Sequence, residues 1–114
     1  MRIAVAQINP TVGDLEGNSR KIIDYINRAK VQKVELVIFP ELCVTGYPPK
    51  DLLVKDSFVK RNHDVLDSII ASTQGIAVIV GFVNAVDGVM YNAAAVIRNG
   101  EVVGIHHKNS LPNY

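Results

Sequence analysis

The feature that most constrains this chain is an apolar run, residues 34–39, that stops at a proline. Apart from Glu35 the run is continuous, which is typical of a strand covered by other layers on both faces. Pro40 follows the run. It disfavours helix at Phe39 and so fixes how the chain leaves the strand. Glu41 follows at once, so a carboxylate stands where the chain leaves a buried strand. In open α/β folds, the loops at such strand ends hold the reactive groups.

Two further strands and two helices are predicted around this run. Residues 3–7 and 76–83 are rich in Ile, Val and Ala, which favours buried strands. Residues 15–30 carry apolar side chains at helical spacing, with charged side chains on the other face. A second helical pattern begins at Asp56, a suitable N-cap, and ends at Gly75. Strand and helix thus alternate from the start of the chain.

The last part of the sequence predicts a β-hairpin. Residues 91–98 and 101–107 flank Asn99-Gly100, a dipeptide that suits the two-residue turn matched to strand twist. The order strand, helix, strand, helix, strand, hairpin predicts an α/β fold with helices covering a sheet face. Because no closing element follows the hairpin before Tyr114, we expect the front part of something larger, or a unit that needs a partner.

The composition excludes several classes of protein. A chain of 114 residues with 48% hydrophobic and 20% charged residues is a single modest globular domain rather than a disordered segment. The net charge of +1, without a basic run, gives no case for a nucleic acid or membrane partner, and no apolar run could span a bilayer. One cysteine rules out an internal disulfide and fits a reducing cytosol, so we expect a cytoplasmic protein.

Glu41 and Lys108 each have two interpretations. Glu41 is either a general base in a partly desolvated pocket, with its pKa raised toward neutrality by burial, or a loop cap or plain surface acid. Lys108, at the end of the predicted hairpin, either stabilises an oxyanion or holds Glu41 charged, or is simply solvated. Taken alone, a glutamate in such a position is more often a loop cap or surface acid than a base, and such a lysine is more often simply solvated. Only the fold can bring them together, and parallel neighbouring strands are one way of doing so.

Two residues near Glu41 are further candidates. Cys43 is two residues away, but no histidine stands near it to activate the thiol, so we interpret it as a small buried hydrophobe. Tyr47 precedes two prolines in a stiff loop. Its ring either forms the wall of a substrate pocket or packs on the proline rings, and the sequence favours neither.

The sequence predicts no metal site. His106 and His107 are adjacent on a predicted strand, so their side chains point to opposite faces and cannot bind one ion together. No HExxH or CxxC motif and no carboxylate cluster occurs, and the glycines form no phosphate-binding pattern. We therefore expect no metal and no cofactor in this segment.

Four segments together resemble the nitrilase (carbon–nitrogen hydrolase) superfamily. Residues 39–47 (FPELCVTGY) look like its glutamate motif, and residues 107–114 (HKNSLPNY) resemble its lysine motif. Residues 48–53 (PPKDLL) and the opening residues 2–15 are similar to the glutaminase domain of glutamine-dependent NAD synthetases. The resemblance covers essentially the whole chain.

This resemblance implies a fold and a set of roles. The fold would be the front part of an α-β-β-α sandwich, with residues 1–114 forming part of a glutamine-hydrolysing domain. Glu41 matches the general base, Lys108 the oxyanion-stabilising lysine, and Tyr47 a position lining the glutamine site. The family's nucleophilic cysteine lies downstream of the lysine motif, and Cys43 does not match it. We therefore expect this chain alone to be inactive.

The resemblance also implies what the complete enzyme does. Its cysteine would attack the side-chain amide of glutamine, and the released ammonia would serve a synthetase domain, absent here, that uses ATP and Mg to convert deamido-NAD to NAD. We expect a homo-oligomer. Two other hypotheses are a relative that acts on another amide or nitrile, and a non-catalytic module that associates through an open sheet face.

Overall fold

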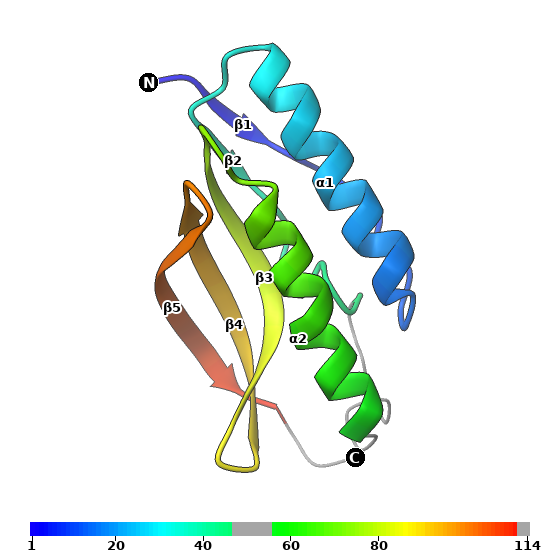
Figure 1. Ribbon diagram of the computed structural model, residues 1–114. Coiled ribbons are helices and arrows are strands. Elements are labelled where there is room, and N and C mark those ends of the chain that lie inside the picture. Colours follow the sequence, from blue (N-terminus) through cyan, green and yellow to red (C-terminus); the bar gives the residue numbers. More distant parts are fainter. Residues whose placement is uncertain (47–55, 112–114) are drawn as a thin grey trace.

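The computed structural model describes residues 1–46 and 56–111, and its strands form one sheet in chain order (Figure 1). The first three strands pair in parallel, and the last two are added as antiparallel hairpins. The strands are β1 (Ile3–Val5), β2 (Leu36–Ile38), β3 (Ala77–Val86), β4 (Val89–Arg98) and β5 (Glu101–Ser110). The predicted α/β class is confirmed.

Both helices lie on the same face of this sheet (Figure 1). α1 (Leu15–Val31) connects β1 to β2, and α2 (Asp56–Ala71) leads from β2 to β3. Parallel strands joined by right-handed crossovers that step in one direction carry their helices on one side. The two helices therefore form one layer, and the sheet forms the second.

The start of α1 is set by Asp14. Its carboxylate accepts a hydrogen bond of 3.0 Å from the backbone N–H of Gly17, which satisfies one of the unpaired donors at a helix start. Arg28 and Lys30 stand in the last turn, where positive charge opposes the negative end of the helix dipole. The predicted helix over residues 15–30 is confirmed within one residue.

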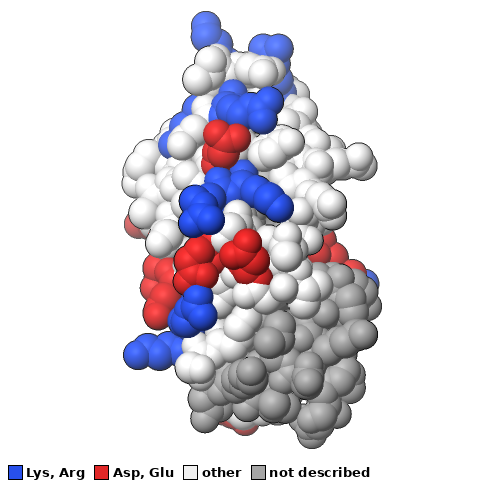
Figure 2. Space-filling view, turned by 90° about the vertical axis from the view of Figure 1, so that its right-hand side faces the viewer, with Lys and Arg blue, Asp and Glu red and all other residues white. Residues whose placement is uncertain are grey.

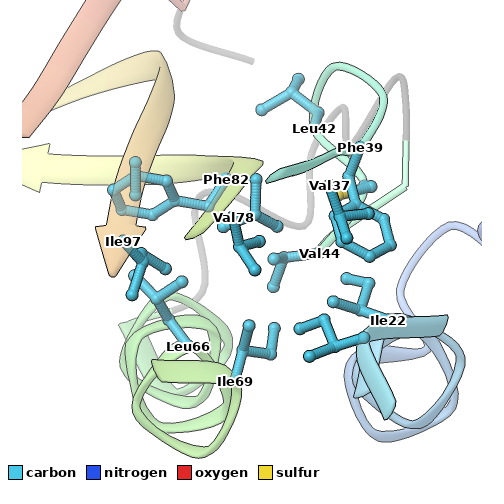
Figure 3. Close-up of a cluster of buried hydrophobic side chains, with 14 of the residues drawn as sticks. Ile22, Val37, Phe39, Leu42, Val44, Leu66, Ile69, Val78, Phe82 and Ile97 are labelled. Atoms are coloured by element: carbon cyan, nitrogen blue, oxygen red, sulfur yellow. The ribbon is translucent and has the colours of Figure 1, made fainter. Parts of the chain in front are cut away.

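The core lies between the helix layer and the sheet (Figure 3). Apolar side chains from both helices meet those of the central strands there, as alternation along the strands and helical spacing predict. Burying one such aliphatic side chain contributes roughly 1.5–3 kcal/mol. The fully buried members include Ile22, Ile26, Ile69, Val37, Val78, Val80 and Ile97.

Two tight turns make the hairpins. Asn99 and Gly100 have φ of 51° and 78°, as the predicted Asn-Gly turn requires, and Asp87 and Gly88 have φ of 49° and 78°. The second of these pairs joins β3 to β4 and was not predicted. The strand expected over residues 76–83 is longer because it continues into this turn.

Outward charges on the helices are mixed in sign. On the face shown in Figure 2, basic and acidic side chains are interspersed. The helices also carry two ion pairs, one within α1 between Arg28 and Asp24 at 3.7 Å, and one between the helices, Arg61 with Glu16. Neither of the two helices described is long and apolar enough to cross a membrane.

The other face of the sheet carries no layer among the described residues. Val37 points into the core, so alternation and register place Ile3 and Val5 on the opposite face. Their side chains are 52% and 70% exposed, and Val96 on β4 is 36% exposed. The described residues thus form two layers, one of helices and one of strands.

Candidate active site

The turn that follows β2 is seated directly on the backbone of β3. Phe39 N–H donates to the Ile79 carbonyl at 2.9 Å, and Val44 N–H donates to the Gly81 carbonyl at 3.2 Å. A Cβ on Gly81 would lie 2.4 Å from the Leu42 nitrogen. Only glycine leaves room for this approach, so Gly81 sets where the turn, and Glu41 within it, can lie.

Leu42 has a strained backbone conformation in this turn. Its φ is 47°, in the left-handed region that L side chains other than Asn and Asp rarely adopt. Such a residue costs on the order of 1–3 kcal/mol and persists only where its surroundings hold it. Here the Leu42 side chain is fully buried, and its carbonyl accepts a 2.9 Å bond from Gly46 N–H. This strained residue, directly beside Glu41, is thus held in place by its burial and by this hydrogen bond.

A buried asparagine fixes the far side of the same turn. Asn18 of α1 is fully buried and donates from its amide to the carbonyls of Val44, at 3.1 Å, and Thr11, at 2.8 Å. Its side-chain oxygen accepts from Thr11 N–H at 2.8 Å. The turn is thereby tied to the loop after β1, and a buried amide with satisfied partners holds one geometry.

Lys108 reaches the turn from an irregularity in β5. Asn92 of β4 is opposite Asn109, whereas the next residue, Ala93, is opposite His107. Lys108 is therefore the extra residue of a β-bulge, a device that redirects a side chain. β3 and β4 lie between β2 and β5. Parallel neighbouring strands, named above as one way of joining the two residues, are thus not the way this fold uses, and the two residues meet across two intervening strands.

Glu41, Lys108 and Asn92 meet at one atom. Lys108 Nζ lies 2.6 Å from Glu41 Oε1, and Asn92 Nδ2 lies 2.6 Å from the same oxygen. The side chains of Lys108 and Glu41 are 66% and 40% exposed, while Asn92 is buried. Glu41 and Lys108 are thus brought together as a pair. Asn92 was not anticipated, because its sequence neighbours give no sign of which face of β4 it occupies.

The raised pKa that went with the general-base interpretation of Glu41 is wrong, whereas Lys108 does hold Glu41 charged, as one interpretation of Lys108 predicted. Hydrogen bonds from Lys108 and then from Asn92 hold the pKa of Glu41 below its ordinary value, and they outweigh desolvation, which acts to raise it. The carboxyl group is too exposed for desolvation to prevail. Glu41 is therefore ionised at neutral pH and can accept a proton.

A cavity of about 360 Å³ opens beside this pair. Phe39 and Ile79 give it an apolar wall, while Glu41 and Lys108 supply charge. A largely apolar hollow with a few convergent polar groups is the usual form of a small-molecule site. The cavity is also lined by Pro40, Gly81, Asn92, Ala93, Ala94 and His106.

Cys43 is turned away from this chemistry. Its side chain is fully buried, and the thiol donates to the Gly81 carbonyl at 3.5 Å. Burial raises the pKa of the Cys43 thiol to about 12, so thiolate does not form at neutral pH. The interpretation of Cys43 as a small hydrophobe is confirmed.

The two adjacent histidines separate as predicted. His106 lines the cavity, whereas the ring of His107 stacks on Tyr91 with centroids 4.1 Å apart. His107 Nε2 also lies 2.9 Å from the Asn84 amide. Within residues 1–46 and 56–111, no group of three His, Cys, Asp or Glu side chains could hold a metal ion. Tyr47 lies outside the described residues.

Comparison with known protein families shows the family of this chain. Residues 2–114 match the carbon–nitrogen hydrolase family model, and the chain belongs to that family. Within it, the chain is 43% identical over 116 residues to the glutamine-dependent NAD(+) synthetase of Thermotoga maritima. That match covers all of this chain and 20% of the relative, so the chain spans about a fifth of the relative's length.

Solved structures agree with this placement. A glutamine-dependent NAD(+) synthetase from Cytophaga hutchinsonii superimposes with a TM-score of 0.91 at 36% identity, over 99% of this chain and 20% of that one. A mutant amidase from Nesterenkonia sp. AN1 superimposes with a TM-score of 0.85 at 25% identity, over 95% and 42%. In that amidase, the acetamide moiety of fluoroacetamide is added covalently at the active-site cysteine.

Proposed function

We propose that this chain forms the first part of the glutamine-hydrolysing domain of a glutamine-dependent NAD synthetase. The observation that carries the proposal is the Glu41–Lys108 pair, 2.6 Å apart, at the edge of a cavity in a carbon–nitrogen hydrolase fold. The likeness to NAD synthetases over the whole chain supports the choice of glutamine as substrate.

The roles follow from the charges at the site. Glu41, held ionised, takes the proton of a cysteine thiol supplied from outside this chain, and the thiolate attacks the carbonyl carbon of the glutamine side chain. Lys108 places its ammonium where the carbonyl oxygen becomes negative. The C–N bond breaks, the proton leaves with the nitrogen as ammonia, and water then cleaves the thioester to give glutamate. Tyr47 lines the glutamine site.

The released ammonia would be used by a synthetase domain that binds ATP and Mg and converts deamido-NAD to NAD. We place the enzyme in the cytoplasm as a homo-oligomer, without nucleic acid or membrane partners. Residues 1–114, which lack a reactive cysteine because Cys43 is buried with a raised pKa, would not hydrolyse glutamine alone.

A relative that hydrolyses another amide is the second candidate. The superposition on the Nesterenkonia amidase favours it, because the same framework there serves an amidase. The reading frame beyond Tyr114 separates the two. A cysteine followed by an ATP-binding domain supports the NAD synthetase, and a cysteine without such a domain supports the amidase.

The decisive experiment compares two nitrogen sources in the complete polypeptide that contains this chain. Glu41→Gln removes the base and is expected to abolish NAD formation from glutamine while leaving formation from added ammonium intact. Asn27→Ala, an exposed site on α1, is the matched control and retains both activities. Equal loss with both nitrogen sources, or full glutamine-dependent activity in Glu41→Gln, would contradict the proposal.

A further inference from the structure

The two carboxylate oxygens of Glu41 differ in their hydrogen bonds. Oε1 accepts hydrogen bonds from Lys108 and from Asn92, each at 2.6 Å. Oε2 accepts no hydrogen bond from any residue in the ranges 1–46 and 56–111. Oε1 is therefore fixed by two hydrogen bonds, and Oε2 is the oxygen that can accept a proton from a reaction partner.

The two donors on Oε1 differ in what they can fix. Lys108 is a point charge on a flexible four-carbon stem, and its side chain is 66% exposed. Asn92 has a short side chain on β4 and is 5% exposed. Lys108 thus supplies charge, whereas the buried amide of Asn92 supplies direction. Asn92 is held in turn by its place in the β3–β4 ladder, opposite Val83.

We propose that Asn92 is a positioning residue that anchors Oε1 of Glu41, so that Oε2 is the atom that takes the proton from the nucleophilic thiol. The inference deepens, and rests on, the proposed glutamine hydrolysis. The thiol S–H bond breaks, its proton moves to Oε2, and the sulfur keeps the electron pair. The same proton later leaves on the ammonia nitrogen, which restores the carboxylate.

The test replaces Asn92 in the complete polypeptide. Asn92→Asp keeps the shape of the side chain but replaces its donor with an acceptor, and a second negative charge there raises the pKa of Glu41. We expect kcat for glutamine hydrolysis to fall about 100-fold with little change in KM, since misplacing a catalytic group by about 1 Å costs this much. The acidic limb of the pH profile should move to higher pH. Asn92→Ala should shift it in the same direction and lose about 10-fold, because loss of one hydrogen bond removes orientation but adds no repulsion.

Asn62→Ala is the control for loss of structure alone. Asn62 is a buried asparagine of α2, and its side-chain amide donates to the Val83 carbonyl at 2.7 Å. Val83 is the β3 residue opposite Asn92. Its loss should lower the unfolding midpoint without moving the pH profile. If Asn92→Asp follows the wild-type profile, or loses activity with an unshifted profile, the inference is overturned.

A second readout separates this inference from the proposed function. The Glu41 carboxyl carbon, labelled with ¹³C and assigned by its loss in Glu41→Gln, is titrated by NMR in the same polypeptides. An upward shift of the midpoint in Asn92→Ala, which adds no charge, supports the positioning role even if the wild type releases no ammonia from glutamine. An unchanged midpoint overturns it whether or not glutamine is hydrolysed.

Discussion

At the scale of single residues, the site depends on how Glu41 is held ionised. The sequence suggested a buried base with a raised pKa, because a carboxylate after a buried strand is expected to be desolvated. The structure replaces that expectation with two short hydrogen bonds on one oxygen. Whether desolvation raises the pKa or hydrogen bonds lower it depends on whether donors stand nearby, and a single sequence cannot show that for residues on different strands.

Removing the Lys108 charge should raise the pKa of Glu41. Lys108→Met deletes the largest of the influences that lower it, so the carboxyl should titrate at higher pH in an NMR titration. Lys60→Met, at an exposed site on α2, is the control and should leave the midpoint unchanged. An unshifted midpoint in Lys108→Met would show that the ion pair does not persist in solution.

The same pair gives stability a defined pH dependence. A carboxyl group whose pKa is lowered on folding binds its proton more weakly when folded, so it stabilises the fold above its unfolded pKa. That contribution is lost as pH falls through the lowered folded pKa. We expect the wild type to lose more stability than Glu41→Gln between neutral and acid pH, as measured by urea unfolding at several pH values. Parallel pH curves would contradict this.

At the scale of elements, the turn after β2 is placed by the strand beneath it. Gly81→Ala should destabilise the chain by roughly 1–3 kcal/mol, because the added Cβ would meet backbone atoms that cannot move aside. Gly104→Ala is the matched control, since a Cβ on this glycine of β5 meets nothing within 4 Å. Urea unfolding of both variants checks this, and equal midpoints would mean that the turn adapts.

The Asn18 network should be equally sensitive. Asn18→Ala removes the partner of the buried Val44 carbonyl and of two part-buried backbone groups of Thr11, and a buried group left without a partner costs about 1–3 kcal/mol. We expect a loss of about 2–4 kcal/mol in the free energy of unfolding. Asn27→Ala, on the exposed face of the same helix, should stay within about 0.5 kcal/mol of the wild type. A small effect at Asn18 would indicate that water replaces the amide.

Elements that depend on residues close in sequence were predicted, whereas contacts that depend on residues far apart in sequence were not. Helix α1 and the turn at Asn99-Gly100 depend on neighbours in sequence and were predicted closely. Asp87-Gly88 carries the same turn signal, but it lies beyond the strand predicted over residues 76–83, so the sequence did not predict a hairpin there. The bulge at Lys108 and the contact of Asn92 with Glu41 depend on strand register, which local sequence does not determine.

At the scale of the whole molecule, the dominant property is a sheet covered on one side. The described residues leave Ile3, Val5 and Val96 exposed on the other face. An apolar face of this kind in water favours association. The expected four-layer sandwich accounts for such a face, since the described residues supply two of its layers.

The isolated 114-residue chain should therefore self-associate and release no ammonia from glutamine. Sedimentation velocity over a range of concentrations should show species larger than a monomer. Replacing Val5 and Val96 with lysine should shift the distribution toward monomer, whereas Lys60→Met, away from that face, should not. A wild-type chain that stays monomeric would contradict this, and so would ammonia release above that of Glu41→Ala.

The close seating of the Glu41 turn on Gly81 also has a genetic consequence. Every single-nucleotide change in a glycine codon that is not silent introduces a side chain or a stop, so every missense change at codon 81 places a Cβ against the Leu42 nitrogen, 2.4 Å away. In a saturation library selected for glutamine-dependent growth, codon 81 should be depleted as strongly as codon 41. A residue with no side chain would then score as if it were part of the catalytic machinery.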